Sequence, residues 1–204
     1  MTGAGPARGL LLYARSRGLP LALGVLAATS ALALWAAHSL DGHLDPQRRV
    51  PVVALAPLFA SAVIGTGFHQ YADELDRTAV RPWWPRRLAQ LLALTALAAA
   101  ALALAVLGHP EEFGAPAMAR NTLGAVGITA AAATLIGARL SWMPTFAYLS
   151  AVYLGAPRTP SGWATLWAWP MQPDAQPGAW AAAGTAFAAG SALYAWRGAR
   201  REGP

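Results

Sequence analysis

The sequence predicts an all-α integral membrane protein with six transmembrane helices, for three reasons. Of its 204 residues, 56% are hydrophobic and only 12% are charged. The apolar residues occur in long blocks, whereas a soluble domain spreads them at helix or strand period. The charged residues lie between the blocks, so the net charge of +6 is read as a membrane orientation signal and not as a sign of a nucleic-acid partner.

Six apolar blocks approach the roughly 20 residues that cross a bilayer as a helix. The first follows Arg8, Arg15 and Arg17, as in a signal peptide, but it is longer than a signal core and five more blocks follow, so we expect it to be retained. The fifth is short and contains Pro144. The predicted spans of this single transmembrane domain, residues 1–204, are Leu19–Ala37, Val50–Phe68, Leu88–Leu107, Asn121–Gly137, Leu140–Leu154 and Ala179–Trp196.

The arginines predict the orientation, because cytoplasmic loops carry an excess of positive residues. With the N-terminus in the cytoplasm, all but four of the fifteen basic residues fall in cytoplasmic segments. The exceptions are Arg48, Arg49, Arg120 and Arg158. Both termini are therefore predicted to be cytoplasmic. The use of arginine for every basic residue, with abundant Ala, Leu, Gly and Pro, is typical of a GC-rich bacterial genome, so we expect a multi-pass protein of the bacterial plasma membrane.

Residues 69–87 then form a cytoplasmic loop between the second and third spans. Asp73–Arg77 places acids at the start of a short helix, where the helix dipole favours them, and Pro82 limits its length. Trp83 and Trp84 are expected at the lipid headgroup level. Orientation requires only arginines, so the acids favour a docking helix for a soluble partner. The alternative is a loop that only fixes the topology.

Residues 155–179 form an apolar segment on the outer side, between the fifth and sixth spans. Apolar residues 163, 166 and 167 fall on one helical face, which predicts a short interfacial helix. Its tryptophans, Trp163, Trp167 and Trp169, are residues that prefer a membrane interface, because the ring is apolar and its N–H requires a polar neighbour. An aromatic belt at the outer surface is one interpretation of these residues.

The layout of the chain resembles that of the permease subunits of type-2 ATP-binding-cassette exporters, especially the small actinobacterial ones. The shared features are an N-terminal amphipathic segment, six spans, a charged loop after the second span, a tight turn after the fourth and an apolar outer segment after the fifth. The resemblance covers nearly the whole chain in layout but involves no strict motif. It implies an N-terminal elbow helix, a coupling helix between the second and third spans, and a re-entrant outer segment.

The resemblance also implies which residues would be functional. Those placed to contact an ATPase are Asp73, Glu74, Asp76, Arg77 and Arg81. Those placed at an outer gate or interface are Trp163, Trp167 and Trp169. The cargo would be amphiphilic, such as a lipid, peptide or antibiotic, with antibiotic resistance as one role.

The chain itself is predicted not to be an enzyme. It contains no GxxxxGK[ST] phosphate-binding loop, so ATP and Mg²⁺ would bind to a separate cytoplasmic ATP-binding subunit. We assign no catalytic residue, metal ligand or cofactor to this chain, and the absence of cysteine excludes disulfides and thiolate chemistry. Because two permease halves line one pathway, we expect a homodimer, or a heterodimer with a second permease.

Two alternatives remain open. Asp73 and Asp76, followed by Arg77 and Arg81, are similar to the first magnesium-binding loop of intramembrane aromatic prenyltransferases. That family needs a second Asp-rich loop, and the only later aspartate is Asp174, predicted outside. The other alternative is a non-transporting membrane partner protein, which would bind a complex without changing ATP hydrolysis.

Few polar residues interrupt the predicted spans. Gln90 and Asn121 lie near span ends, where we expect them to stay hydrated. Small residues predict faces for close helix approach on the fourth span, at Gly124 and Ala131. The sixth span has a similar set, formed by Ala182, Ala186 and Gly190.

Overall fold

The computed structural model describes residues 19–40, 50–68, 83–106, 114–156 and 162–200. The predicted all-α class is confirmed for these residues, which form helices joined by turns. The elements are α2 (Leu19–Leu40), α3 (Val50–Thr66), α5 (Trp84–Ala105), α6 (Ala115–Ile136), α7 (Trp142–Gly155), α8 (Ala164–Trp167), the 3₁₀ helix η2 (Trp169–Met171) and α9 (Pro177–Arg197). The predicted elbow and coupling helices fall in residues 1–18 and 69–82, outside the described residues.

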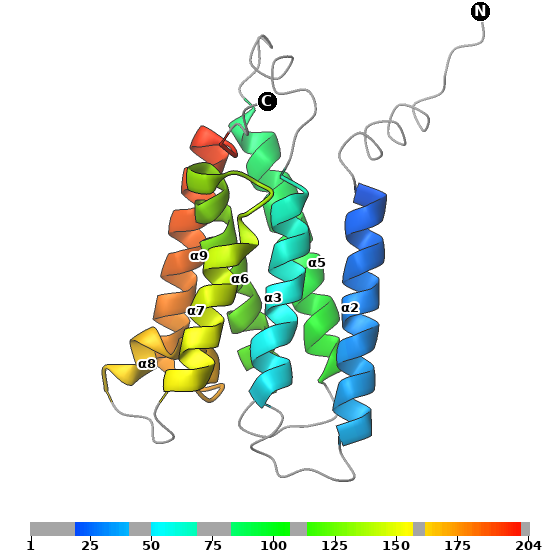
Figure 1. Ribbon diagram of the computed structural model, residues 1–204, viewed down its shortest axis with the longest axis vertical. Coiled ribbons are helices and arrows are strands. Elements are labelled where there is room, and N and C mark those ends of the chain that lie inside the picture. The colour runs from blue at the N-terminus through cyan, green and yellow to red at the C-terminus, as the bar shows by residue number, and fades with distance from the viewer. Residues whose placement is uncertain (1–18, 41–49, 69–82, 107–113, 157–161, 201–204) are drawn as a thin grey trace, which may run out of the picture.

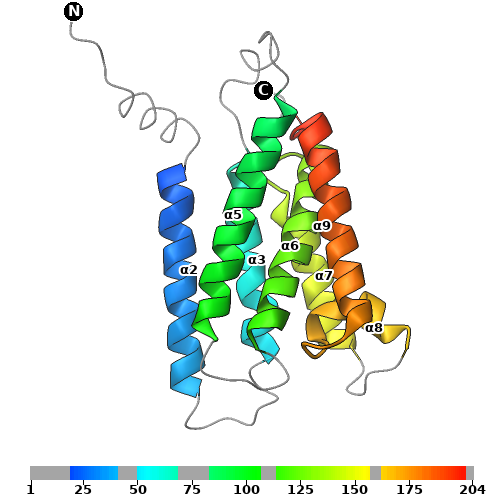
Figure 2. The ribbon, with the colours of Figure 1, turned by 180° about the vertical axis from the view of Figure 1, so that it is seen from behind.

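The long helices α2, α3, α5, α6, α7 and α9 stand side by side and alternate in direction (Figure 1). The start of α2 and the end of α9 consequently lie at the same end of the bundle, which we call the upper end after its place in Figure 1. Helix α6 is central and packs on α9, α3, α5 and α7. Helix α2 stands at the edge, against α3 and α5, as the view from behind also shows (Figure 2).

Prolines in the first turn begin three of the long helices, α5, α6 and α9. Proline suits this position because the first amides of a helix have no partner within it and the ring fixes a helical φ. In α6 the proline is Pro116, so the helix starts at Ala115, six residues before the predicted block at Asn121. Arg120 is consequently inside the helix and not in an outer loop.

The pair α6 and α9 makes the most extensive contact in the bundle. Its closest point joins Gly127 and Gly190, because a Cβ on Gly190 would overlap the backbone oxygen of Gly127. A Cβ on Gly127 would meet the backbone of Ala186 and Phe187 in turn, with Phe187 Cα 2.5 Å away. The predicted close-approach face is therefore present on α9 at Ala186 and Gly190.

Polar side chains inside the bundle are paired mostly with helix backbone. Thr95 donates to Leu91 O over 2.7 Å and Thr122 donates to Met118 O over 2.8 Å. Between helices, the buried hydroxyls of Thr129 on α6 and Thr145 on α7 lie 2.7 Å apart and share a hydrogen bond. The interior thus accommodates hydroxyl groups without unpaired donors at these positions.

Large apolar side chains cover much of the outer surface. They come from every long helix and include Leu32, Trp35, Phe59, Leu92, Leu97, Leu104, Leu135, Phe146, Leu154 and Trp196. Within the described residues, α5 is the one helix that has both the length and the hydropathy needed to cross a bilayer, and Leu23–Leu32 and Leu55–Thr66 are shorter apolar stretches. Only 33% of the apolar stretch of α5 is buried, whereas the core helix of a soluble protein is mostly buried.

Candidate functional site

The predicted functional residues divide into two groups in the structure. Asp73, Glu74, Asp76, Arg77 and Arg81 lie in residues 69–82, outside the described residues. The three tryptophans, by contrast, lie in a described segment at the lower end of the bundle (Figure 1). This lower segment, residues 162–176, joins α7 to α9 and contains α8 and η2.

The three tryptophans have different environments. Trp163, at the N-terminal end of α8, is 75% exposed, whereas Trp169 in η2 is only 4% exposed. Trp167, at the end of α8, is half-buried. The predicted short helix is present as the single turn Ala164–Trp167. Trp163 therefore faces the surroundings of the bundle, while Trp169 belongs to its core.

Trp169 fits into the bundle because α6 has a glycine opposite it. A Cβ on Gly124 would overlap the Trp169 ring, so only glycine leaves room for the indole. The ring also stacks on Tyr148 of α7, with centroids 5.8 Å apart. The Tyr148 hydroxyl also donates to Trp167 O over 2.6 Å. The lower segment is thus fixed to α7 by a hydrogen bond and a ring contact.

A buried arginine attaches the segment to α6. Arg120 is fully buried, and its guanidinium donates to two backbone oxygens, Nη1 to Pro173 over 2.8 Å and Nη2 to Gln172 over 2.7 Å. Its Nε donates to Asn121 Oδ1 over 3.2 Å, and Asn121 Nδ2 donates to Pro170 O over 2.9 Å. Two adjacent side chains of α6 therefore bind three carbonyls of the lower segment.

Asp174 completes the attachment from the opposite direction. Its carboxylate accepts hydrogen bonds from the first-turn amides of α6, with Oδ1 2.9 Å from Ala117 N and 3.1 Å from Gly114 N. These amides have no partner within the helix, and the helix dipole favours a negative charge at this end. The backbone oxygen of Asp174 accepts from Trp180 Nε1 over 2.9 Å, which adds a bond to α9.

The arrangement is a polar clamp, which we define as Arg120, Asn121 and Asp174. Its opposite charges lie on the two elements that it joins, so the attraction between Arg120 and Asp174 draws these elements together. In the described part of the chain, no group of three His, Asp or Glu side chains is placed to hold a metal ion. The clamp itself binds backbone groups, and these hydrogen bonds fix the position of the lower segment.

Two members of the clamp differ from the expectation based on the sequence. The prediction that Asn121 stays hydrated is wrong, because it is buried against the carbonyl of Pro170. The orientation signal assigns Arg120 to the outer-loop charges, and the structure buries it in α6. The signal in the sequence is the helix-starting Pro116 placed ahead of both residues, which predicts that they lie within the first turns of the helix.

Comparison with known protein families, curated proteins and solved structures finds no match. The resemblance to exporter permeases accordingly rests on the layout of the chain and on the placement of its residues.

Proposed function

We propose that this chain is the membrane-spanning permease subunit of an ATP-driven exporter of amphiphilic cargo, working with a separate ATPase chain in a bacterial plasma membrane. The observation that carries the proposal is the distribution of side chains across the bundle. Large apolar side chains face outward along all six long helices, while Thr129, Thr145 and the polar clamp lie inside. A bilayer, and not water, is the surrounding that such a surface suits.

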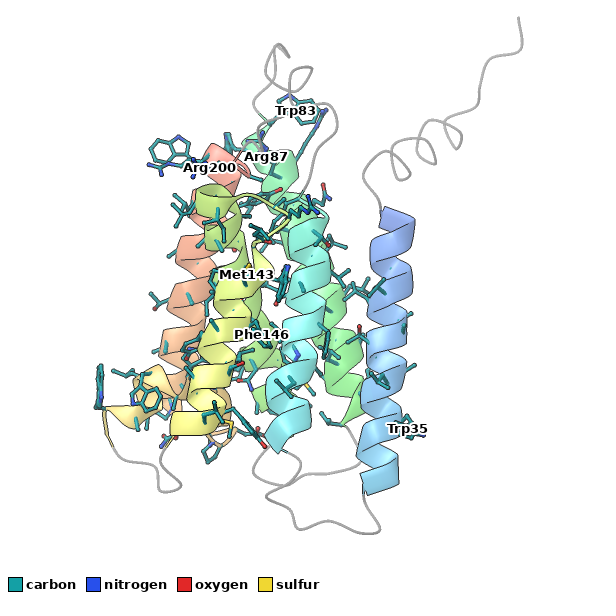
Figure 3. The ribbon with its side chains drawn as sticks, viewed as in Figure 1. Trp35, Trp83, Arg87, Met143, Phe146 and Arg200 are labelled. Carbon is teal, nitrogen blue, oxygen red and sulfur yellow. The ribbon has the colours of Figure 1, made fainter. Side chains whose placement is uncertain are left out.

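The placement of arginines supports cytoplasmic termini. Five described arginines lie in or next to helix ends at the upper end of the bundle, where Figure 3 labels Arg87 and Arg200. They are Arg86 and Arg87 in the first turn of α5, Arg139 in the turn after α6, Arg197 at the end of α9, and Arg200 just after it. The start of α2 lies at this end too. An excess of arginine on one side is the orientation signal of plasma-membrane proteins, so the upper end is assigned to the cytoplasm.

The clamp supports a functional role for the lower segment. In a membrane protein a charged side chain inside the bundle is costly, and such residues mark functional or structurally essential positions. Here Arg120 and Asp174 hold an apolar segment against the bundle at the end assigned to the outside. This position matches that of the outer segment in the exporter layout, and the exposed Trp163 with the buried Trp169 fits a segment that lies partly in the outer interface.

In the proposed mechanism, ATP binding closes two ATPase subunits, and the loop that contains Asp73 and Asp76 transmits this motion to the bundle. Two permease chains form one pathway, as a homodimer or with a second permease. The described parts of the long helices carry few ionisable side chains away from their ends, which favours amphiphilic cargo over ions.

The test is purification of the chain from its own host in a mild detergent, followed by mass spectrometry of the proteins that accompany it. We expect a stoichiometric ATP-binding subunit with the wild type, and its loss in the double variant Asp73→Ala/Asp76→Ala. The matched control is Glu111→Ala/Glu112→Ala, which removes two acids from a loop on the predicted outer side and should retain the subunit.

Other outcomes select the alternatives. If an ATPase accompanies the chain but its turnover is the same with and without it, the chain is a non-transporting partner. If no ATPase is found, the exporter proposal fails, and Mg²⁺-dependent diphosphate binding that requires Asp73 and Asp76 would favour the prenyltransferase-like enzyme.

A further inference from the structure

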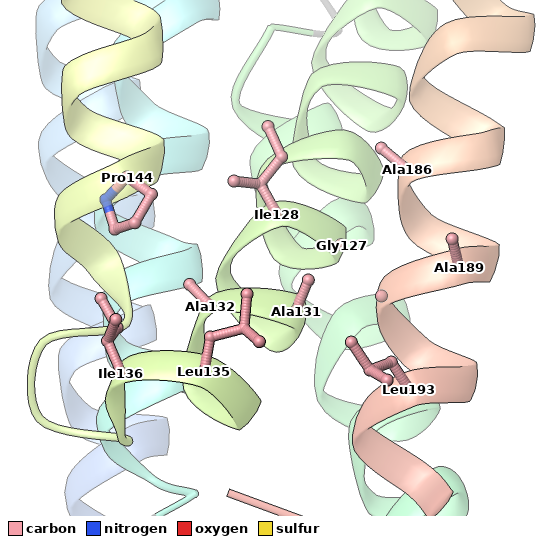
Figure 4. A pocket seen from close by; sticks show the side chains of 11 residues that line it. Gly127, Ile128, Ala131, Ala132, Leu135, Ile136, Pro144, Ala186, Ala189 and Leu193 are labelled. Atoms are coloured by element: carbon pink, nitrogen blue, oxygen red, sulfur yellow. The ribbon is translucent and has the colours of Figure 1, made fainter. Parts of the chain in front are cut away.

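An apolar groove of about 410 Å³ runs along the surface of the bundle between α7 and α9, with α6 as its floor (Figure 4). Its size falls within the roughly 300–1,000 Å³ of small-molecule sites. The lining is apolar and includes Ile128, Leu135 and Ile136 of the floor, Pro144 of α7, and Ala189 and Leu193 of α9. Leu135 and Ile136 are exposed, so the groove opens sideways at the outer surface of the bundle.

Small residues on α6 and α9 create this space. The two helices approach closely at Gly127 and Gly190, and next to that contact both helices present alanines, such as Ala131 and Ala189, where larger side chains would fill the groove. Pro144, in the first turns of α7, forms the opposite wall. The groove therefore follows from the helix packing and does not depend on a loop.

The groove has the length of one membrane leaflet. Its floor extends along α6 from Gly127 to Ile136, which at about 1.5 Å per residue is roughly 14 Å. Half of a hydrocarbon core is about 15 Å thick. Leu135, Ile136 and Leu193 lie near the ends of α6 and α9, at the upper end of the bundle. The groove thus spans the apolar part of the leaflet on that side.

Two arginines lie near its upper end, Arg197 and Arg200. Arg197 follows Leu193 by one helical turn on the same face of α9. Arg200 donates from Nη1 to Leu135 O over 2.8 Å, which holds its guanidinium beside this end of the floor. The one carboxylate in the described part of the chain, Asp174, lies at the other end of the bundle. The apolar groove therefore ends in positive charge that no described acid neutralises.

We infer that this groove binds one anionic phospholipid of the cytoplasmic leaflet, with an acyl chain along α6 and the phosphate at Arg197 and Arg200. An acyl chain matches the apolar walls and the length, and an anionic headgroup matches the charge at the upper end. The inference rests on the membrane placement in the proposed function and not on the ATPase partner.

The test is native mass spectrometry of the detergent-purified chain titrated with phosphatidylglycerol, and with phosphatidylcholine of the same acyl chains. We expect one phosphatidylglycerol to bind more tightly than phosphatidylcholine. The dissociation constant for phosphatidylglycerol should rise roughly fivefold for each arginine removed in Arg197→Gln and Arg200→Gln. The matched control Arg86→Gln removes an exposed arginine of α5 from the same end and should bind as the wild type does.

A second pair of variants tests the groove itself. Ala189→Phe places a ring in the groove and should abolish tight binding, whereas Ala188→Phe adds the same ring at the adjacent exposed position, which does not line the groove. Excess glycerol phosphate, which has no acyl chain, should not displace the lipid. Displacement by glycerol phosphate would identify a simple anion site and overturn the inference.

Equal binding of the two lipids, or equal loss in the two phenylalanine variants, would also overturn it. The comparison of the two lipids uses the wild-type chain, so it tests the preference for an anionic lipid even if Ala189→Phe does not fold. A wrong membrane placement can be distinguished from a wrong lipid site, because the chain would then be recovered from host cells without detergent.

Discussion

The guanidinium of Arg120 donates a hydrogen bond of 2.7 Å to the backbone oxygen of Gln172, 52 residues further along the chain. Because Arg120 is fully buried, this carbonyl and that of Pro173 replace the water that the cation would otherwise bind. The attachment of the lower segment to α6 therefore consists of hydrogen bonds from a charged donor, which are stronger than those between neutral groups.

Replacing Arg120 should therefore destabilise the bundle. Arg120→Leu leaves the carbonyls of Gln172 and Pro173 without donors and Asp174 without its opposite charge, so we expect a loss of about 3 kcal/mol in the free energy of unfolding. Arg120→Lys should rescue only part of it, because one ammonium cannot reproduce the planar fork of donors. Denaturant unfolding in mild detergent measures both.

The control for this experiment is Arg86→Leu, which removes an exposed arginine whose Cζ lies 4.8 Å from the centre of the Trp83 ring. We expect a loss below about 1 kcal/mol. Equal stability of Arg120→Leu and the wild type would show that the clamp does not hold the segment.

Removing the acidic member of the clamp should have a smaller effect. Asp174→Ala deprives Gly114 N and Ala117 N of their acceptor, which should cost about 0.5–2 kcal/mol, the usual range for a lost helix cap. Asp174→Asn keeps one oxygen for these amides and should lose less. Thermal unfolding of the two variants and the wild type gives their order of stability. An Asn variant as unstable as the Ala variant would contradict the capping role.

The contact between α6 and α9 predicts a difference between two glycines of the same helix. In Gly190→Ala the new methyl group collides with the backbone of Gly127, so we expect a loss of about 1–3 kcal/mol. Gly184 has open space within 4 Å of the point where a methyl group would attach, so Gly184→Ala should be neutral or stabilise α9 by up to about 1 kcal/mol. Unfolding curves for both variants test this packing. Equal shifts of the two unfolding midpoints would contradict the close contact between Gly127 and Gly190.

The hydroxyl pair between α6 and α7 can be measured by a double-mutant cycle. Thr129→Val and Thr145→Val each remove one partner of the 2.7 Å hydrogen bond, and each should destabilise the bundle. The double variant should be less destabilised than the sum of the two by about 0.6 kcal/mol, the typical coupling of such bonds inside membrane bundles. Strict additivity would mean that the two hydroxyls do not interact.

Cysteine labelling in intact cells tests the orientation, with no background from this cysteine-free chain. Gly162→Cys at the lower end is exposed and has open space around it, and Leu140→Cys is exposed in the turn between α6 and α7. An impermeant maleimide added outside should label the first variant at once and the second only after permeabilisation. The reverse pattern would invert the proposed topology.

The positions of the long helices could be predicted from the sequence because hydropathy acts over whole segments. The start of α6 could not be placed from hydropathy, since the polar pair Arg120 and Asn121 interrupts the apolar residues, while Pro116 begins the helix earlier. Hydropathy reports which residues are apolar, whereas the start of a helix depends on backbone groups and on the cap.

The clamp was beyond prediction for a related reason. The partners of Arg120 are the backbone oxygens of Gln172 and Pro173, and every residue has such an oxygen, so no side-chain pattern marks them. Likewise, the spacing of Trp163 and Trp169 does not reveal that the first is exposed and the second buried. Trp169 can be buried because Gly124, which is far away in the sequence, leaves room for its ring.

The separation of Asp174 from Gly114, 60 residues along the chain, also has a consequence for biosynthesis. At about 5–20 residues per second, roughly 3 to 12 s pass between the synthesis of the start of α6 and that of its cap. During that interval Arg120 and the first amides of α6 have to bind water or other polar groups. In the membrane placement proposed above, the beginning of α6 stays at the membrane surface until the lower segment is made, and α9 follows directly behind that segment.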